Sequence, residues 1–201
     1  SAVKKYALQK GLNILQPTNL KNEAFLKELE ILKANLQIVV AFRMLPTIIW
    51  KMPEYGTFNL HASLLPNYRG AAPINWAIIN GETKTGVSTF FIDEKIDTGN
   101  IILQEEISIS EDETVGELHD KLMTIGSELV VKTLKLISEN TIVTTKQPEI
   151  EEKLAPKIFT ETCKINWNAS VNSIYNLIRG LNPYPTAWTT LINNNEEIKV
   201  K

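Results

Sequence analysis

The stretch TFNLHASLLPNYRG, residues 57–70, places two polar side chains at the end of a short strand-like run. Asn59 and His61 stand two positions apart, and side chains at that spacing point to the same side of an extended strand. Pro66 and Gly70 then force the chain to turn. A carboxamide beside a titratable ring can polarise a carbonyl group and move a proton. We therefore predict that Asn59 and His61 belong to a catalytic site.

A third polar group is needed to orient the imidazole ring, and the best candidate is Asp97 in the segment IDTGN. Local sequence alone favours a different role for Asp97, that of a turn aspartate that bonds its own backbone. His119 lies within a long helical pattern, and we expect it to be a partly exposed helix residue. Ser63 lacks the glycine-flanked turn that exposes a nucleophilic serine, so we expect it to be a ligand contact.

Strand and helix patterns alternate on both sides of this stretch. The run 36–42, LQIVVAF, is apolar on both faces, which is typical of a central parallel strand. The alternation predicts an α/β fold with a Rossmann-like, mostly parallel sheet and an antiparallel edge. Ligands of such sheets bind beyond the carboxyl ends of the strands, where His61 and Arg43 lie. Helices are expected at 3–10, at 22–35 with Asn22 as its cap, at 47–52, at 71–80, at 114–137 with Thr114 and Glu117 at capping-box spacing, and at 171–180. Strands are expected at 12–17, 36–42, 57–61, 86–92, 100–109 and on both sides of the Asn-rich turn near residue 194.

The composition is that of a globular protein, with 43% apolar and 22% charged residues among 201. The net charge of −2 leaves no global excess of basic residues for a phosphate backbone, so any nucleic-acid contact has to be local. The single cysteine, Cys163, indicates a reducing compartment and allows no paired-cysteine metal site. No apolar run is long enough to span a bilayer, and we expect a cytoplasmic protein without a membrane segment.

Other chemistries are disfavoured by missing motifs. No glycine-rich phosphate loop is present, which argues against a dinucleotide-binding oxidoreductase. The four tryptophans are expected to be packing anchors rather than stacking platforms. Arg69 either binds an anion or caps a neighbouring carbonyl, and both roles stay open.

Residues 59–82, NLHASLLPNYRGAAPINWAIINGE, and 85–102, TGVSTFFIDEKIDTGNII, closely resemble the folate-dependent formyltransferases. The family pattern is an Asn, a His two residues later, Ser-Leu-Leu-Pro, and then Asp-Thr-Gly or Asp-x-Gly. The resemblance implies 10-formyltetrahydrofolate as co-substrate, with no metal. It gives the family's catalytic positions to Asn59, His61 and Asp97. It gives the tetrahydrofolate-binding loop to Ser63, Leu64, Leu65 and Pro66, and the pterin pocket to Arg43, Met44 and Leu45.

Within this family the chain looks most like the members that formylate initiator methionyl-tRNA. The aminosugar formyltransferases usually carry Arg-Gly-Arg-Ala-Pro, whereas residues 69–73 read Arg-Gly-Ala-Ala-Pro. The glycinamide ribonucleotide formyltransferases normally lack the C-terminal extension. The implied function is transfer of a formyl group to methionyl-initiator-tRNA by direct attack of the amine. The alternatives are a formyltransferase for a UDP-aminosugar or glycinamide ribonucleotide, a formyl-folate hydrolase, and a folate- or tRNA-binding module without turnover.

The resemblance also implies a division of the chain. Residues 1–147 correspond to the formyltransferase catalytic domain, without its first strands. Two prolines and a cluster of charges in residues 147–157 indicate a linker that crosses the surface, and we take residues 148–157 as this linker. By the resemblance, residues 158–201 correspond to the start of an OB-like β-barrel domain that helps to hold tRNA. We therefore expect a fragment of a longer protein, and a monomer.

Overall fold

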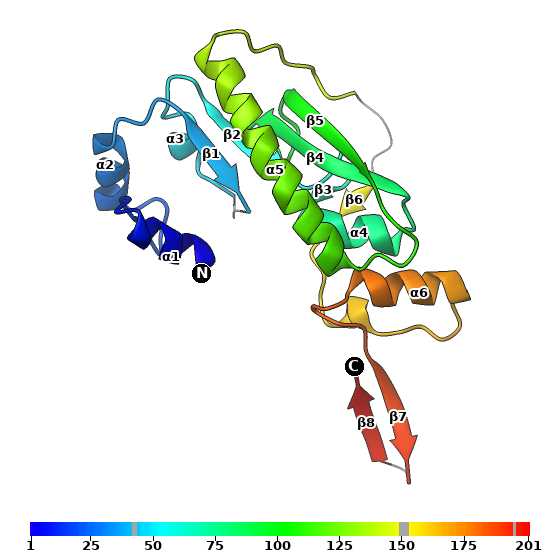
Figure 1. Cartoon of the computed structure of the whole chain (residues 1–201). Helices are drawn as coiled ribbons and strands as arrows, with labels where there is room; N and C mark the ends of the chain where they lie inside the picture. The colour runs from blue at the N-terminus through cyan, green and yellow to red at the C-terminus, as the bar shows by residue number, and fades with distance from the viewer. Residues whose placement is uncertain (42–43, 149–152, 195) are drawn as a thin grey trace. The chain divides into compact units, whose positions relative to one another are not determined.

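A computed structural model describes residues 1–41, 44–148, 153–194 and 196–201 (Figure 1). The chain forms two compact units. The first unit comprises residues 1–37 and 42–57, and the second comprises residues 38–41 and 58–201.

The first unit contains the helices α1 (Ala2–Gln9), α2 (Glu23–Ile31) and α3 (Thr47–Trp50). The Asn22 side chain accepts a hydrogen bond from the backbone N–H of Phe25, which confirms the predicted cap of α2. The predicted strand at 12–17 is wrong, because these residues form no strand. A strand needs a neighbour to take up its backbone hydrogen bonds, and no ladder partner lies beside 12–17 among the described residues.

The main sheet has the order β1-β2-β4-β5 (Figure 1). Its strands are β1 (Gln37–Val40), β2 (Thr57–His61), β4 (Lys84–Phe91) and β5 (Ile101–Ser108). The α/β class is confirmed, and so is the antiparallel pair formed by β4 and β5. Strand β2 is also antiparallel to β4. The antiparallel part of the sheet is therefore wider than predicted, because the chain between β2 and β4 stays at one end of the sheet instead of crossing it.

Strand β1 does not have the central position that its sequence indicates. It comes first in the sheet order, and the side chains of Ile38 and Val40 are 41% and 59% exposed. An apolar run shows that a strand could be buried on both faces, but burial also requires elements packed against those faces. Strand β4 has the buried pattern instead, with Thr85 to Phe90 all buried.

Helix α5 (Val115–Ser138) packs against β4 and β5 (Figure 1). Thr114 and Glu117 form the predicted capping box at its start. Its buried face contributes to a core that β4 and α4 (Pro73–Ile79) complete. The buried residues of this core are Ala77, Ile78, Val87, Ile109, Val115, Leu118, Leu122 and Leu129.

Two very short strands connect the turn after β2 with the segment after α5. Strand β3 (Arg69–Gly70) pairs in parallel with β6 (Leu154–Ala155). Ala155 is fully buried, and its carbonyl oxygen also accepts from the backbone N–H groups of Ala71 and Ala72. Part of the segment predicted to be a surface linker is therefore bonded into the second unit.

The end of the chain forms a short 3₁₀ helix (Glu161–Cys163), helix α6 (Val171–Gly180) and the antiparallel strands β7 (Thr189–Asn193) and β8 (Glu196–Val200). The predicted pair of strands in this region is confirmed. Helix α6 packs against α4, and the Asn75 amide donates to the carbonyl oxygen of Gly180. Within the described residues, no helix combines the length and apolar character needed to cross a bilayer.

Candidate active site

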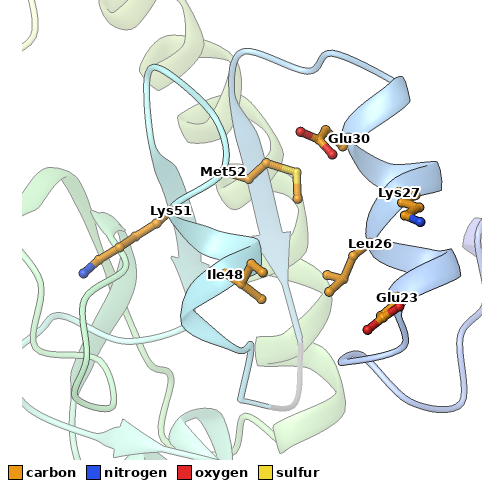
Figure 2. Close-up of a pocket in the computed structure, with 7 residues that line it drawn as sticks. All are labelled: Glu23, Leu26, Lys27, Glu30, Ile48, Lys51 and Met52. Atoms are coloured by element: carbon orange, nitrogen blue, oxygen red, sulfur yellow. The ribbon is translucent and has the colours of Figure 1, made fainter.

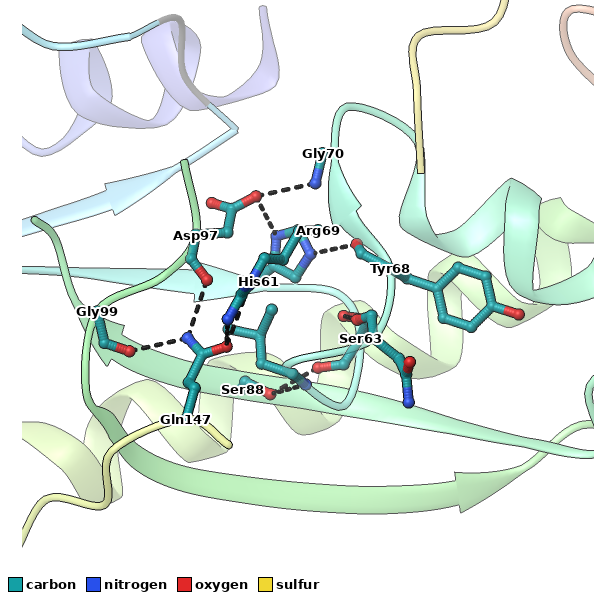
Figure 3. Close-up of polar contacts among 11 residues, drawn as sticks. His61, Ser63, Tyr68, Arg69, Gly70, Ser88, Asp97, Gly99 and Gln147 are labelled. Atoms are coloured by element: carbon teal, nitrogen blue, oxygen red, sulfur yellow. Dashed lines mark hydrogen bonds and ion pairs between the residues drawn. The ribbon is translucent and has the colours of Figure 1, made fainter. Parts of the chain in front are cut away.

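Asn59 and His61 lie on strand β2, in the second unit. Figure 3 shows His61 with its polar contacts. Both side chains are buried, and in the antiparallel register Asn59 lies opposite Phe90 and His61 lies opposite Ser88. Residues two apart on a strand share one face, so the sheet presents the carboxamide and the imidazole on the same side.

The two ring nitrogens of His61 have different partners. Nε2 lies 2.8 Å from the carbonyl oxygen of Tyr68. Because a carbonyl oxygen only accepts, Nε2 must carry the hydrogen, and in a neutral ring Nδ1 then has the free lone pair. Nδ1 faces Asp97, whose Oδ2 lies 3.8 Å away. Nδ1 is thus the ring atom that faces the carboxylate and is left to act on a ligand.

Tyr68 was not predicted from sequence, although it fixes the His61 ring. Its φ of 62° lies in the left-handed region, and its backbone N–H donates to the carbonyl oxygen of Lys153. Its hydroxyl donates to Glu82. Burial raises the pKa of Tyr68, and the hydrogen bond to Glu82 raises it further, so the hydroxyl stays a neutral donor. A backbone carbonyl acceptor has no sequence signal, and only the turn residues around Tyr68 could have pointed to it.

Asp97 lies in the connection between β4 and β5 with a φ of 55°. Its Oδ2 accepts from the backbone N–H of Gly70 at 2.9 Å. The turn bonds that were the alternative for Asp97 are made by Asp93, which accepts from the backbone of Lys95 and the hydroxyl of Thr98. The structure therefore brings Asp97 and His61 together, at a distance too long for a direct hydrogen bond.

Gly99 allows the Asp97 loop to pass close to β4. A Cβ atom at this position would overlap the carbonyl oxygen of Phe91. The glycine of the Asp-Thr-Gly segment is thus required by the close approach of two backbones. The backbone is therefore held close to β4 two residues after Asp97.

Asn59 leaves a polar atom without a partner. The side chain is 3% exposed, and its Oδ1 has no hydrogen-bond partner among the described residues. Buried polar atoms are nearly always paired in folded proteins, so an orphan atom beside His61 indicates a place where a polar ligand binds. The amide can present its oxygen or its N–H groups to such a ligand.

Hydrogen bonds within the second unit hold residues 63–66, the loop predicted to bind tetrahydrofolate. Ser63, Leu65 and Pro66 are buried, and Leu64 is partly exposed. The hydroxyl of Ser63 donates to the carbonyl oxygen of Asn67. The loop backbone bonds to Ser88 and Gln104, which fixes its shape. The folate-binding role of these residues stays a prediction. The Ser63 hydroxyl already donates to Asn67, so towards a ligand it is left as an acceptor.

The remaining predicted residues lie elsewhere in the chain. Arg43 lies outside the described residues. Met44 and Leu45 belong to the first unit, where Met44 is 68% exposed and Leu45 is half-buried. The guanidinium group of Arg69 donates to the Gln147 side chain. His119 is exposed on α5 and lies 3.1 Å from Asp120, as expected of a helix surface residue.

The first unit has a separate hollow along α2 and the segment that contains α3 (Figure 2). Leu26, Ile48 and Met52 give it an apolar floor, and charged side chains surround them. Of the predicted site residues that the structure describes, none lines this hollow. Among the described residues, no group of three or more His, Cys, Asp and Glu side chains could hold a metal ion.

Family models match both parts of the chain. The model described as "Formyl transferase" matches residues 1–134, and the model described as "Formyl transferase, C-terminal domain" matches residues 157–201. The chain belongs to the formyl transferase family. Among curated members of this family, the methionyl-tRNA formyltransferase of Flavobacterium johnsoniae is 63% identical over 202 aligned residues. The alignment covers all of this chain and 64% of that relative, so the chain spans less than two thirds of the relative's length.

Solved structures of other formyl transferases share the fold. A 4-N formyltransferase from Francisella tularensis superposes with a TM-score of 0.76 at 22% identity, covering 99% of this chain and 80% of that one. WlaRD, a sugar 3N-formyl transferase solved in the presence of dTDP and 5-N-formyl-THF, gives a TM-score of 0.74 at 26% identity. That match covers 98% of this chain and 68% of WlaRD.

Proposed function

We propose that the protein transfers a formyl group from 10-formyltetrahydrofolate to the α-amino group of methionine on initiator tRNA. The observation that carries this proposal is the 63% identity, over the whole chain, to a curated methionyl-tRNA formyltransferase. The arrangement of Asn59, His61 and Asp97 supports it, because it supplies the groups that such a transfer needs.

The reaction is a direct displacement at the formyl carbon. A bond forms between this carbon and the amine nitrogen, and the bond to the folate nitrogen breaks. The Asn59 amide and the Nδ1–H of a protonated His61 would donate to the formyl oxygen as negative charge develops on it. Tyr68 would keep the ring oriented through Nε2. Asp97 would accept the proton that the amine loses, directly or through a water molecule, and deliver it to the departing folate nitrogen.

The residues present fit a formyl-folate donor. The orphan Oδ1 of Asn59 is a buried polar atom without a partner, on the strand that carries His61. The fixed loop 63–66 is proposed to support the pterin ring, and the family resemblance also assigns residues 43–45 to pterin binding. WlaRD, a member of the same fold, was solved with 5-N-formyl-THF. The orientation of the pterin would depend on backbone groups, because three of the four loop side chains are turned into the protein.

The proposed acceptor is a tRNA, and the net charge of −2 requires that its contacts be local. The end of the chain contains one such local feature. The ammonium groups of Lys164 and Lys199 lie 5.2 and 3.9 Å from the centroid of the Trp188 ring. Trp188 is also anchored by its N–H, which donates to the carbonyl oxygen of Thr160. This exposed basic group supports the proposal that residues from 158 onward help to hold the acceptor.

The proposed organisation follows from this function. Residues 1–147 would form the catalytic part, 148–157 the connection, and 158–201 the beginning of a tRNA-binding part. A role in translation initiation would place the protein in the cytoplasm, and we propose that it acts as a monomer.

Replacement of His61 tests the proposed chemistry. His61→Ala should lower single-turnover formyl transfer by about 100-fold or more, because one donor to the developing oxyanion is lost. Binding of 10-formyltetrahydrofolate should persist. His119→Ala is the matched control and should keep full activity, since His119 is exposed on α5. The assay requires a form of the protein with the length of its curated relatives. Undiminished transfer by His61→Ala would remove His61 from the mechanism.

A further inference from the structure

Gln147 is a buried amide that joins three separate segments of the second unit (Figure 3). It is 5% exposed. Its Nε2 donates to the carbonyl oxygens of Asp97 at 2.9 Å and Gly99 at 2.8 Å. Its Oε1 accepts from Arg69, from Nε at 3.2 Å and from Nη2 at 2.6 Å. A carboxamide offers two N–H donors and two acceptor lone pairs, and all four are used here.

The segment that Gln147 holds has an unusual backbone. Asp97 has a φ of 55°, in the left-handed region that residues with a Cβ rarely adopt. Such a conformation persists only where the surroundings hold it in place. The two carbonyl groups bonded to Gln147 lie on either side of Thr98. The hydrogen bonds from Gln147 therefore hold the backbone conformation that determines the direction of the Asp97 side chain.

Hydrogen bonds connect Asp97, Gln147 and the Arg69–Gly70 segment in a closed circuit. Gly70 donates its backbone N–H to Asp97 Oδ2, and its neighbour Arg69 donates to Gln147. Gln147 in turn donates to the carbonyl oxygen of Asp97. The charged guanidinium polarises the amide, which makes the N–H groups of Gln147 stronger donors to the two carbonyls. The backbone and the side chain of Asp97 are thus held from the same two segments.

We propose that Gln147 is a positioning residue, which holds Asp97 so that its carboxylate faces Nδ1 of His61. Gln147 itself contacts backbone carbonyls and Arg69, and it acts on the reacting groups only through Asp97. The inference rests on the proposed function, because the position of Asp97 has a catalytic effect only if this site transfers a formyl group.

Two substitutions separate the contacts of Gln147. Gln147→Leu has similar size and removes all four hydrogen bonds. Gln147→Glu keeps an acceptor for Arg69 but has no N–H group for the two carbonyl oxygens, and it places an anionic oxygen against them. Both should release the Asp97 segment. Lys146→Ala is the matched control, since Lys146 is the exposed neighbour in the chain.

The position of the carboxylate is read from the His61 ring by nuclear magnetic resonance. The chain has only two histidines, so long-range ¹H–¹⁵N spectra of the imidazoles contain two spin systems. At one fixed pH, both Gln147 variants should shift the Nδ1 resonance of His61 and leave His119 unchanged. Lys146→Ala should leave both rings unchanged. An unshifted His61 Nδ1 in either folded variant would overturn the proposal. Unfolding of both variants would also overturn it, because Gln147 would then be required by the fold itself.

The kinetic part of the test uses a form of the protein with the length of its relatives. Gln147→Leu should lower the single-turnover rate about 100-fold, as expected for a reacting group displaced by about 1 Å. The dissociation constant for 10-formyltetrahydrofolate should stay within about twofold, because the lost interaction matters only in the transition state. An unchanged rate would overturn the proposal. Absence of transfer in the unaltered protein would instead contradict the proposed function, and the shift of the His61 resonance would still decide the role of Gln147.

Discussion

The two nitrogen atoms of the His61 ring face different residues of the candidate site. The backbone carbonyl oxygen of Tyr68 accepts a hydrogen bond from Nε2, and the Asp97 carboxylate lies 3.8 Å from Nδ1. The gap between ring and carboxylate is wider than a hydrogen bond, so both groups keep capacity for a reacting molecule. In the proposed mechanism the two groups therefore act on the substrates rather than only on each other.

Replacing Asp97 by asparagine tests the proposed proton transfer. Asp97→Asn keeps an oxygen for the Gly70 N–H but is no longer a base, so the transfer rate should fall by about 10²- to 10⁴-fold with its pH profile altered. The measurement is the single-turnover rate as a function of pH. Asp93→Asn is the matched control, because it lies in the same loop and keeps its turn acceptor. A rate and pH profile equal to those of the unaltered protein would refute the role of Asp97.

For single residues, the sequence predicts features that depend on neighbouring positions and misses contacts between residues far apart in the chain. A spacing of two on a strand predicted that Asn59 and His61 share one face. Asp97 was the sequence candidate to orient the ring although its own neighbourhood favoured a turn role, and the turn bonds are made by Asp93. Tyr68 and Gln147 were missed. One acts through a backbone carbonyl, and the other through a contact 50 residues away along the chain.

Elements were predictable where their signals are carried by nearby residues. The capping box of α5 and the Asn22 cap of α2 are where sequence places them. The wrong predictions concern which strands pair with each other. Residues 12–17 have the composition of a strand but no ladder partner, and β2 pairs with β4 in the antiparallel direction. Propensity describes one segment, whereas a sheet depends on what lies beside it.

The turn between β2 and α4 is stabilised by a carboxylate that titrates. Tyr68 and Lys153 both donate to Glu82. Burial acts to raise the pKa of Glu82, but these hydrogen bonds outweigh it, and the pKa lies below its ordinary value of 4.5. The stabilisation is therefore present above pH 4.5 and is lost as the pH falls through the lower pKa of the folded state.

Glu82→Gln should remove this stabilisation. Urea unfolding should show a lower free energy of unfolding for the variant at neutral pH. The difference between the two proteins should shrink as the pH falls below 4.5, because the unfolded state is protonated first and the folded state follows at its lower pKa. A difference that stays constant from pH 7 to about pH 3 would show that the charge of Glu82 does not stabilise the turn.

For the molecule as a whole, the connection after α5 contacts the segments that carry the candidate site residues. Gln147 bonds the Asp97 loop, and the segment 153–155 pairs with the turn that carries Tyr68 and Gly70. Prolines and charges in 147–157 indicated a surface linker, and they gave no sign of these contacts. The chain also spans only 64% of its curated relative, so acceptor choice has to be measured in a protein of the relative's length.

The most direct measurement is a single-turnover assay with 10-formyltetrahydrofolate and three acceptors offered in parallel: methionyl initiator tRNA, a UDP-aminosugar and glycinamide ribonucleotide. We expect formylation of the methionine amine and no product with the other two acceptors. Formylation of the aminosugar or the ribonucleotide in preference to the tRNA would contradict the assigned acceptor. Binding of folate without transfer to any acceptor would contradict the enzymatic role itself.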